Sequence, residues 1–242
     1  MTTATNVRLK LLGHAELSVD GAPGKALPKK AFAIAARLIL STTERKATRD
    51  DLATFLWPEA AEDQRRANLR TVVKRIRIAL REIAGAPFVI DEETISLDLG
   101  GTSCDLVDFI AAVRHGRLSD VVEATRLFTG DLLEDSETGP ETFRYWLEQE
   151  RKRLGRQFAR AATRALKGGE LLGQPRLREA IELKILSARP IDATAHKALL
   201  RLQTPRGGSR PQRSATPFAM PGWPFTAAGF ASPASEDGAQ AL

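Results

Sequence analysis

The segment from Asp63 to Arg81 is the part of this sequence that most constrains its fold. It holds seven basic residues and one acid, so its net charge of +6 equals the formal charge of the whole 242-residue chain. On a helical wheel that is extended to residue 83, five apolar side chains fall in one narrow sector and a sixth, Val72, lies beside it. They are Leu69, Val72, Val73, Ile76, Leu80 and Ile83. The pattern predicts a helix that buries this stripe and exposes a cationic face.

The opposite side of the predicted helix carries amide, hydroxyl and basic groups. Its members are Gln64, Ala67, Asn68, Thr71, Lys74, Arg75 and Ile78. Groups of this kind on a rigid helix suit a DNA major groove, where they read base edges while flanking Arg and Lys side chains contact phosphates. A solvated basic face is the alternative, and the helix alone does not decide between the two.

Composition narrows the class of protein. With 43% hydrophobic residues the chain can build two modest cores, and its pI near 9.8 favours a polyanionic partner. The single cysteine, Cys104, excludes an internal disulfide and a Cys-based metal site. The longest apolar run, Ala31 to Leu40, contains Arg37 and falls short of the roughly 18 to 20 residues that span a bilayer. We therefore expect a cytoplasmic protein with a buried helix at this run.

Short-range patterns around the basic segment predict a winged helix. Apolar and polar residues alternate in two segments before it, and Thr48 followed by Asp51 is a helix N-cap signature. The expected elements are strands over 7–12 and 15–20, helices over 28–41, 48–56 and 63–81, and a hairpin of 88–90 and 94–99. In this order two helices brace a third for entry into a groove.

The second half of the chain is expected to be all-α. The predicted helices cover 106–115, 118–128, 141–166, 176–187 and 192–202, and their short Gly and Pro breaks suggest a tetratricopeptide-like stack. The arginines of 141–166 are interpreted as a solvated face paired with Glu148 and Glu150, in preference to a DNA contact.

The predicted fold class is an α+β N-terminal winged helix followed by an all-α tetratricopeptide-like helical domain and a disordered C-terminal tail. The corresponding ranges are 1–100, 104–203 and 204–242. The tail holds six of the 13 prolines and five of the 18 glycines, with no lasting helical periodicity.

Several motifs resemble a known family. The runs LPKKAFAIAARLIL, TRDDLATFLWPEA and RRANLRTVVKRIRIALRE resemble the OmpR-type winged helix of the Streptomyces antibiotic regulatory protein (SARP) family. LWP at 56–58 and ANLR at 67–70 are the most specific pieces. CDLVDF at 104–109, GDLLED at 130–135 and YWLEQERKRL at 145–154 resemble the bacterial transcriptional activator domain that follows it. The resemblance spans about residues 7 to 202, and the tail departs from the family.

The resemblance implies a bacterial transcription activator that binds direct repeats in promoter double-stranded DNA and contacts RNA polymerase, with a homodimer as a candidate assembly. Such a protein would be cytoplasmic and associated with the nucleoid when bound to DNA. Matching the basic helix to the OmpR-type pattern makes Thr71 and Arg75 base-facing residues, with Asn68 as a further candidate. The implied phosphate contacts are Arg70, Lys74, Arg77 and Arg81.

Little in the sequence indicates an enzyme, a metal site or a cofactor. The three histidines, His14, His115 and His196, have no partner at ligand spacing, and no Lys-Ser or Lys-Thr follows Gly168 and Gly169 as a phosphate loop requires. The acids at 91–93 would keep the tip of the hairpin away from DNA. A protein-interaction adaptor built on the helical stack remains the main alternative function, and an RNA-binding regulator is a weaker one because aromatic residues are scarce.

Overall fold

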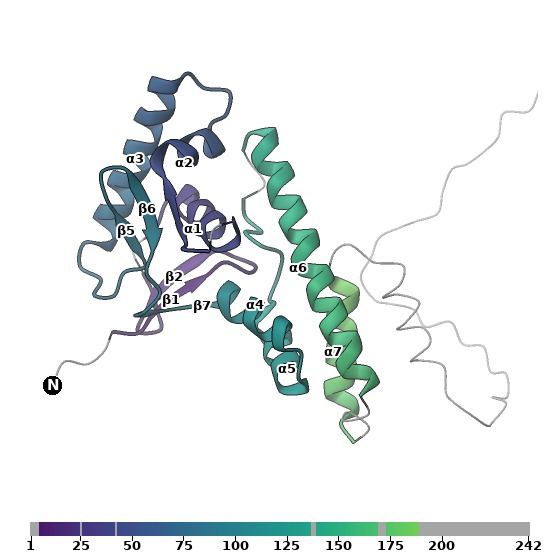
Figure 1. Cartoon of the computed structure of the whole chain (residues 1–242). Coiled ribbons are helices and arrows are strands. Elements are labelled where there is room, and N and C mark those ends of the chain that lie inside the picture. The colour runs from purple at the N-terminus through teal and green to yellow at the C-terminus, as the bar shows by residue number, and fades with distance from the viewer. Residues whose placement is uncertain (1–4, 25, 42, 137–138, 169–172, 189–242) are drawn as a thin grey trace, which may run out of the picture. The chain divides into compact units, whose positions relative to one another are not determined.

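The computed structural model describes residues 5–24, 26–41, 43–136, 139–168 and 173–188 (Figure 1). The strands are β1 (Val7–Lys10), β2 (Glu16–Val19), β3 (Ala22–Pro23), β4 (Lys46–Thr48), β5 (Phe88–Ile90), β6 (Thr94–Leu97) and β7 (Thr102–Cys104). The helices are α1 (Lys29–Ser41), α2 (Arg49–Leu56), α3 (Glu62–Leu80), α4 (Asp105–His115), α5 (Leu118–Leu127), α6 (Glu141–Lys167) and α7 (Pro175–Ser187).

The predicted helices agree with these seven to within a residue at each end. Of the predicted strands, the one over 88–90 has the predicted bounds and the other three are shorter. The strands β3, β4 and β7 were not predicted. The helix predicted over 192–202 and the tail 204–242 lie outside the described residues. None of the described helices is long and apolar enough to cross a membrane.

Two small sheets frame the N-terminal half. In one sheet, in the order β3-β2-β1-β7, β1 pairs antiparallel with β2 and parallel with β7. The parallel register places Val7 opposite Thr102 and Leu9 opposite Cys104. The other sheet has the order β4-β6-β5, so the predicted hairpin gains a third strand from the segment before α2.

The helices α1, α2 and α3 pack beside these sheets in the order expected of a winged helix (Figure 1). The predicted stripe of α3 is buried from Leu69 to Leu80, and full burial of one such Leu, Ile or Val side chain is worth about 1.5–3 kcal/mol. The predicted N-cap is confirmed, because Thr48 Oγ1 accepts a hydrogen bond from the Asp51 N–H at 3.1 Å. Local sequence patterns therefore account for this part of the fold.

An aromatic cluster holds the helical half together. Phe109 of α4 stacks on Phe128 at the end of α5 with a centroid distance of 5.2 Å, and Phe158 of α6 lies 5.6 Å from Phe128. All three rings are buried. The turn between α4 and α5 is made by Gly116, whose φ of +67° is one that residues with a side chain rarely adopt.

The N-terminal and helical halves are joined at two places. Arg37 of α1 lies over the ring of Phe55 in α2 at 4.8 Å and over Trp146 in α6 at 5.8 Å, and the two rings meet edge to face with centroids 5.0 Å apart. Elsewhere the GDLLED segment runs beside the chain after β1, where the Leu133 N–H donates to the Leu11 carbonyl at 2.9 Å. The described residues of both halves belong to one compact unit, Met1–Thr204. The boundary predicted between 100 and 104 stays a prediction.

Two charged side chains reinforce the second joint. Asp105, at the start of α4, is only 4% exposed, and its carboxylate accepts hydrogen bonds from the backbone N–H groups of Leu11 at 2.8 Å and Leu12 at 3.0 Å. Arg151 of α6 donates to the carbonyls of Leu132 and Leu133, each at 2.8 Å. The solvated, Glu-paired interpretation is therefore wrong for Arg151. Its guanidinium gives the buried Leu132 carbonyl a donor and adds a second one to the Leu133 carbonyl, which also accepts from the Ser136 N–H at 2.9 Å.

Candidate nucleic-acid interface

The outward face of α3 is the main candidate interface. Opposite the buried stripe, Gln64, Thr71, Lys74, Arg75 and Ile78 are exposed, and Ala67 and Asn68 are half-buried. The predicted polar and cationic face is thus present on a helix whose other side is anchored in the core. A helix held in this way can enter a groove without rearranging its own backbone.

The three predicted base-facing residues lie along this face. The Asn68 side-chain oxygen accepts a hydrogen bond from Gln64 Nε2 at 2.9 Å, and the Thr71 hydroxyl donates to the Ala67 carbonyl at 3.1 Å. Arg75 is exposed. Asn68 keeps its amide donors and Thr71 its acceptor lone pairs, so each retains groups that base edges can engage.

The four predicted phosphate contacts fall into two groups. Lys74 and Arg81 are exposed, and Arg81 is the residue that caps the C-terminus of α3. Arg70 and Arg77 are exposed but already hydrogen-bonded, Arg70 Nε to the Arg66 carbonyl at 3.4 Å and Arg77 Nη2 to the Ile90 carbonyl at 3.1 Å. The contact of Arg77 ties α3 to the β5–β6 hairpin and leaves four of its five N–H donors for another acceptor.

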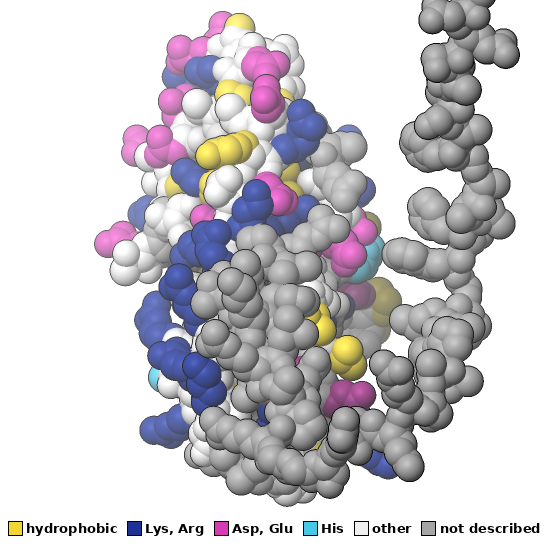
Figure 2. Space-filling model, turned by 90° about the vertical axis from the view of Figure 1, so that its right-hand side faces the viewer, with side chains coloured by type: hydrophobic (Ala, Val, Ile, Leu, Met, Phe, Trp, Pro, Cys, Tyr) yellow, Lys and Arg dark blue, Asp and Glu magenta, His cyan; other side chains and the backbone are white. Residues whose placement is uncertain are grey.

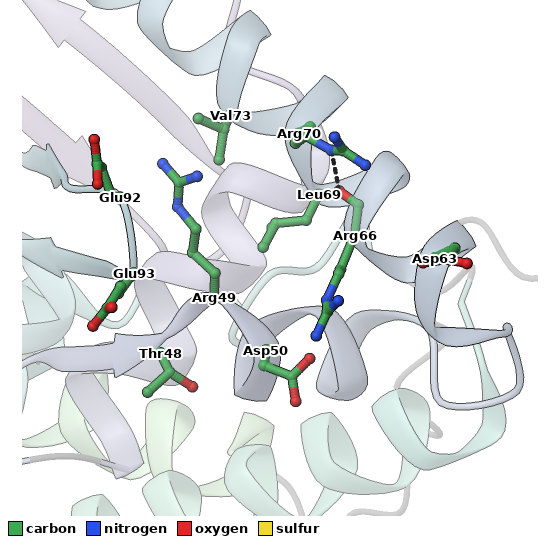
Figure 3. A pocket seen from close by; sticks show the side chains of 10 residues that line it. All are labelled: Thr48, Arg49, Asp50, Asp63, Arg66, Leu69, Arg70, Val73, Glu92 and Glu93. Atoms are coloured by element: carbon green, nitrogen blue, oxygen red, sulfur yellow. Dashed lines mark hydrogen bonds between the residues drawn. The ribbon is translucent and has the colours of Figure 1, made fainter.

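A pocket of about 580 Å³ lies between α3, the start of α2 and the tip of the hairpin (Figure 3). Figure 3 shows the Arg49 side chain rising between Glu92 on one side and Leu69 with Val73 on the other. Arg49 Nε is buried and has no hydrogen-bond partner among the described residues.

The charges around this pocket are mixed. Arg49, Arg66 and Arg70 line it together with four acids, Asp50, Asp63, Glu92 and Glu93. Arg49 and Arg66 were not predicted as site residues, because the TRDDL run indicates only a helix start and Arg66 falls outside the predicted base-reading face. The sequence shows that both residues are basic and lie in predicted helices. Only the fold shows that Arg49 lies beside α3.

The tip of the hairpin is acidic and exposed, as the sequence predicted. The Asp91 N–H donates to the Thr94 carbonyl at 3.0 Å, and this closes a turn that presents Glu92 and Glu93. The Glu93 carbonyl accepts from the Arg49 N–H at 2.8 Å, so the turn is fixed against the start of α2. At close range these carboxylates repel a phosphate backbone.

Other reactive groups offer little chemistry. Burial raises the pKa of the Cys104 thiol to about 12, with a smaller contribution from the neighbouring Asp105 carboxylate, so at neutral pH the group is a protonated thiol. His14 Nδ1 contacts Asp135 Oδ2 at the surface. Within the described ranges, no group of three or more His, Cys, Asp or Glu side chains could hold a metal ion.

Comparison with known proteins adds one structural likeness. No protein-family model matches the sequence, and no curated protein matches it. Among solved structures, the chain is similar to Mycobacterium tuberculosis EmbR in complex with a low-affinity phosphopeptide, with a TM-score of 0.47 and 20% identity. The match covers 83% of this chain and 59% of that one, so this chain spans less than two thirds of the EmbR structure. Similarity at this level establishes neither a family nor a function.

Proposed function

We propose that this protein is a sequence-specific, double-stranded DNA-binding regulator of transcription. The observation that carries the proposal is the outward face of α3, where Asn68, Thr71 and Arg75 lie among exposed cations on a helix anchored by its buried stripe. Arg75 is the strongest candidate for base reading, because a guanidinium can donate two hydrogen bonds to guanine O6 and N7.

In this proposal Lys74, Arg70, Arg77 and Arg81 contact phosphates and position the helix. The acidic tip of the hairpin stays off the duplex. If about four to six phosphates are neutralised, log affinity should fall against log salt with a slope of about −4 to −5.

The first experiment selects bound sequences from randomised duplex DNA with the full-length protein and repeats the binding at two salt concentrations. An enriched motif supports sequence reading, whereas retention without enrichment would reduce α3 to a general basic surface. No retention at low salt would favour the adaptor function instead.

Two variants on α3 then separate the proposed roles. Arg75→Ala should flatten the preference at one base pair, with a loss of about 1–3 kcal/mol of discrimination. Lys74→Ala should weaken binding to all sequences alike and reduce the salt slope by about 1. Equal losses on the selected motif and on random DNA for both variants would contradict this assignment.

The activating role of the helical half rests on the SARP resemblance. In that extension of the proposal, the helices after β7 form the tetratricopeptide-like activator region, which supports dimerisation or contacts RNA polymerase while α3 holds the promoter. Transcription in vitro from a template bearing the selected motif tests it, with purified bacterial RNA polymerase. Promoter binding without any increase in transcript would retain DNA recognition and remove activation.

A further inference from the structure

The C-terminal half of α6 exposes a run of cations without acids. From Arg151 to Lys167 the helix contains no Asp or Glu. We define the α6 ridge as Arg156, Arg160, Arg164 and Lys167. The first three follow one another at intervals of four residues, so they lie on one side of the helix about 6 Å apart along its axis. Arg160, Arg164 and Lys167 are exposed, and Arg156 is half-buried.

No acid among the described residues pairs with the ridge. The nearest acids on the helix are already engaged, Glu148 with Lys152 at 3.4 Å and Glu150 with Arg153 at 2.6 Å. The predicted pairing of the α6 arginines with Glu148 and Glu150 therefore holds for Arg153 and not for the ridge. Like charges four residues apart destabilise a helix, so the ridge is unfavourable for folding by itself.

The helix dipole explains only part of this arrangement. Arg164 and Lys167 lie in the last turn of α6, where cations interact favourably with the carbonyl end of the helix. Arg156 and Arg160 lie before that turn, beyond the reach of the dipole. They need another explanation.

The positive surface continues onto the turn between α4 and α5. A Cβ added at Gly116 would lie 3.5 Å from Arg164 Nη2, which places the ridge beside that turn. Arg114 and Arg117 flank this turn, and both are exposed. Figure 2 shows the molecule from the right-hand side of Figure 1, where α6 lies. Lys and Arg side chains form a column down the left of this face.

We propose that the α6 ridge is a docking surface for an acidic helical segment of a partner protein. A partner helix with Asp or Glu at four-residue intervals repeats at the same axial spacing of about 6 Å, so each cation meets a carboxylate. A duplex held by α3 does not fit as well, because α3 lies at one end of the unit and the C-terminal half of α6 at the other (Figure 1). The proposal goes beyond DNA recognition and does not depend on it.

The test compares two variants of the full-length protein that each remove two positive charges from an exposed helix face. Arg160→Gln with Arg164→Gln changes the ridge, and Lys74→Gln with Arg75→Gln changes α3. Glutamine is a good helix former, and thermal melts by circular dichroism confirm that both variants fold. The probes are a labelled polyglutamate of about 20 residues, which spans the ridge if helical, and a random DNA duplex of similar length.

Binding is measured by fluorescence anisotropy at about 50 and 200 mM salt. Each variant should lose affinity for one probe only, and the loss should be larger at the lower salt concentration. The ridge variant should weaken polyglutamate binding by about 2-fold to 30-fold, as expected for two exposed charge pairs, and leave duplex binding unchanged. The α3 variant should do the reverse. The two proposals can fail separately. If the wild type and both variants fail to bind the duplex, but only the ridge variant binds polyglutamate more weakly, the DNA proposal fails and the ridge proposal stands.

Three results would overturn the ridge proposal. Equal loss of polyglutamate binding in both variants would show that this binding depends only on the net charge of the protein. Loss of duplex binding in the ridge variant, with polyglutamate binding intact, would make the ridge a nucleic-acid surface. Absence of polyglutamate binding by the wild-type protein at the lower salt concentration would leave the ridge without an acidic partner.

Discussion

Replacing Asp105 by alanine should destabilise both halves of the protein together. Its carboxylate accepts from the backbone N–H groups of Leu11 and Leu12, and these residues lie in the segment that links β1 to the GDLLED loop. Asp105, Leu11 and Leu12 are all buried. Removal of the side chain therefore leaves two backbone donors without an acceptor and without access to water.

The expected loss follows from the number of orphaned groups. Each buried, unsatisfied donor costs about 1–3 kcal/mol, so Asp105→Ala should lower the free energy of unfolding by about 2–6 kcal/mol. Asp105→Asn keeps one acceptor oxygen and should lose about half as much. Asp108→Ala is the matched control, because Asp108 lies in the same first turn of α4 and is exposed, so its loss should stay within about 1 kcal/mol.

The pH dependence of the same site has a definite sign. Burial raises the pKa of Asp105 above its usual 3.8, and the N–H groups of Leu12 and Leu11 oppose this only in part. The folded protein therefore holds this proton more tightly than the unfolded chain. The contribution of the group to stability is present below pH 3.8 and is lost as the pH rises through the raised folded pKa. The advantage of the wild type over Asp105→Asn should shrink as the pH rises across that range.

Urea denaturation followed by far-UV circular dichroism measures both effects, with the midpoint and the slope fitted at each pH. Loss of stability in Asp105→Ala no greater than in Asp108→Ala would refute the argument from orphaned donors. If the stability advantage of the wild type over Asp105→Asn instead grows with pH, the hydrogen bonds from the two N–H groups lower the pKa of Asp105 more than burial raises it.

Three further outcomes are expected. Neutralising the acids at 91–93 to Asn, Gln and Gln should strengthen binding to random duplex DNA in a salt-dependent way, and weaker binding would show that the hairpin tip makes a needed contact. Arg151→Met should lower the free energy of unfolding by about 3–6 kcal/mol, because the hydrogen bonds to the carbonyls of Leu132 and Leu133 are each worth about 1.5–3 kcal/mol. A loss below about 1 kcal/mol in urea denaturation would contradict this. Cys104 should react with a disulfide reagent at neutral pH only after denaturation, and rapid labelling of the folded protein would be inconsistent with its burial and raised pKa.

Much of the secondary structure and the exposed polar face of α3 could be predicted from the sequence. The stripe from Leu69 to Leu80 repeats with the helical period, and the N-cap at Thr48 is a contact between residues three apart. Because these signals operate within one or two helical turns, the residues themselves carry them. The outward position of Thr71 and Arg75 follows from the same period, since a helix that buries one side exposes the other.

The pairings between distant segments had no local signal. β7 lies parallel to β1 although about 95 residues separate them, and a short strand such as Thr102–Cys104 has no periodicity that would distinguish it from a loop. The same limit applies to Arg49, which the fold places beside α3, and to Arg77, whose hydrogen bond to Ile90 depends on the position of the hairpin.

Charge alone could not separate cations that hold the fold together from cations left for a partner. Arg151 and Arg160 are the same residue type on the same helix, but one donates to two loop carbonyls and the other is exposed without a partner among the described residues. The sequence determined which faces of each helix are apolar or charged, because that depends on spacing along the chain. Only the tertiary structure decided what each charged face meets, because that depends on which distant backbone and side-chain groups the packed core brings within hydrogen-bonding distance.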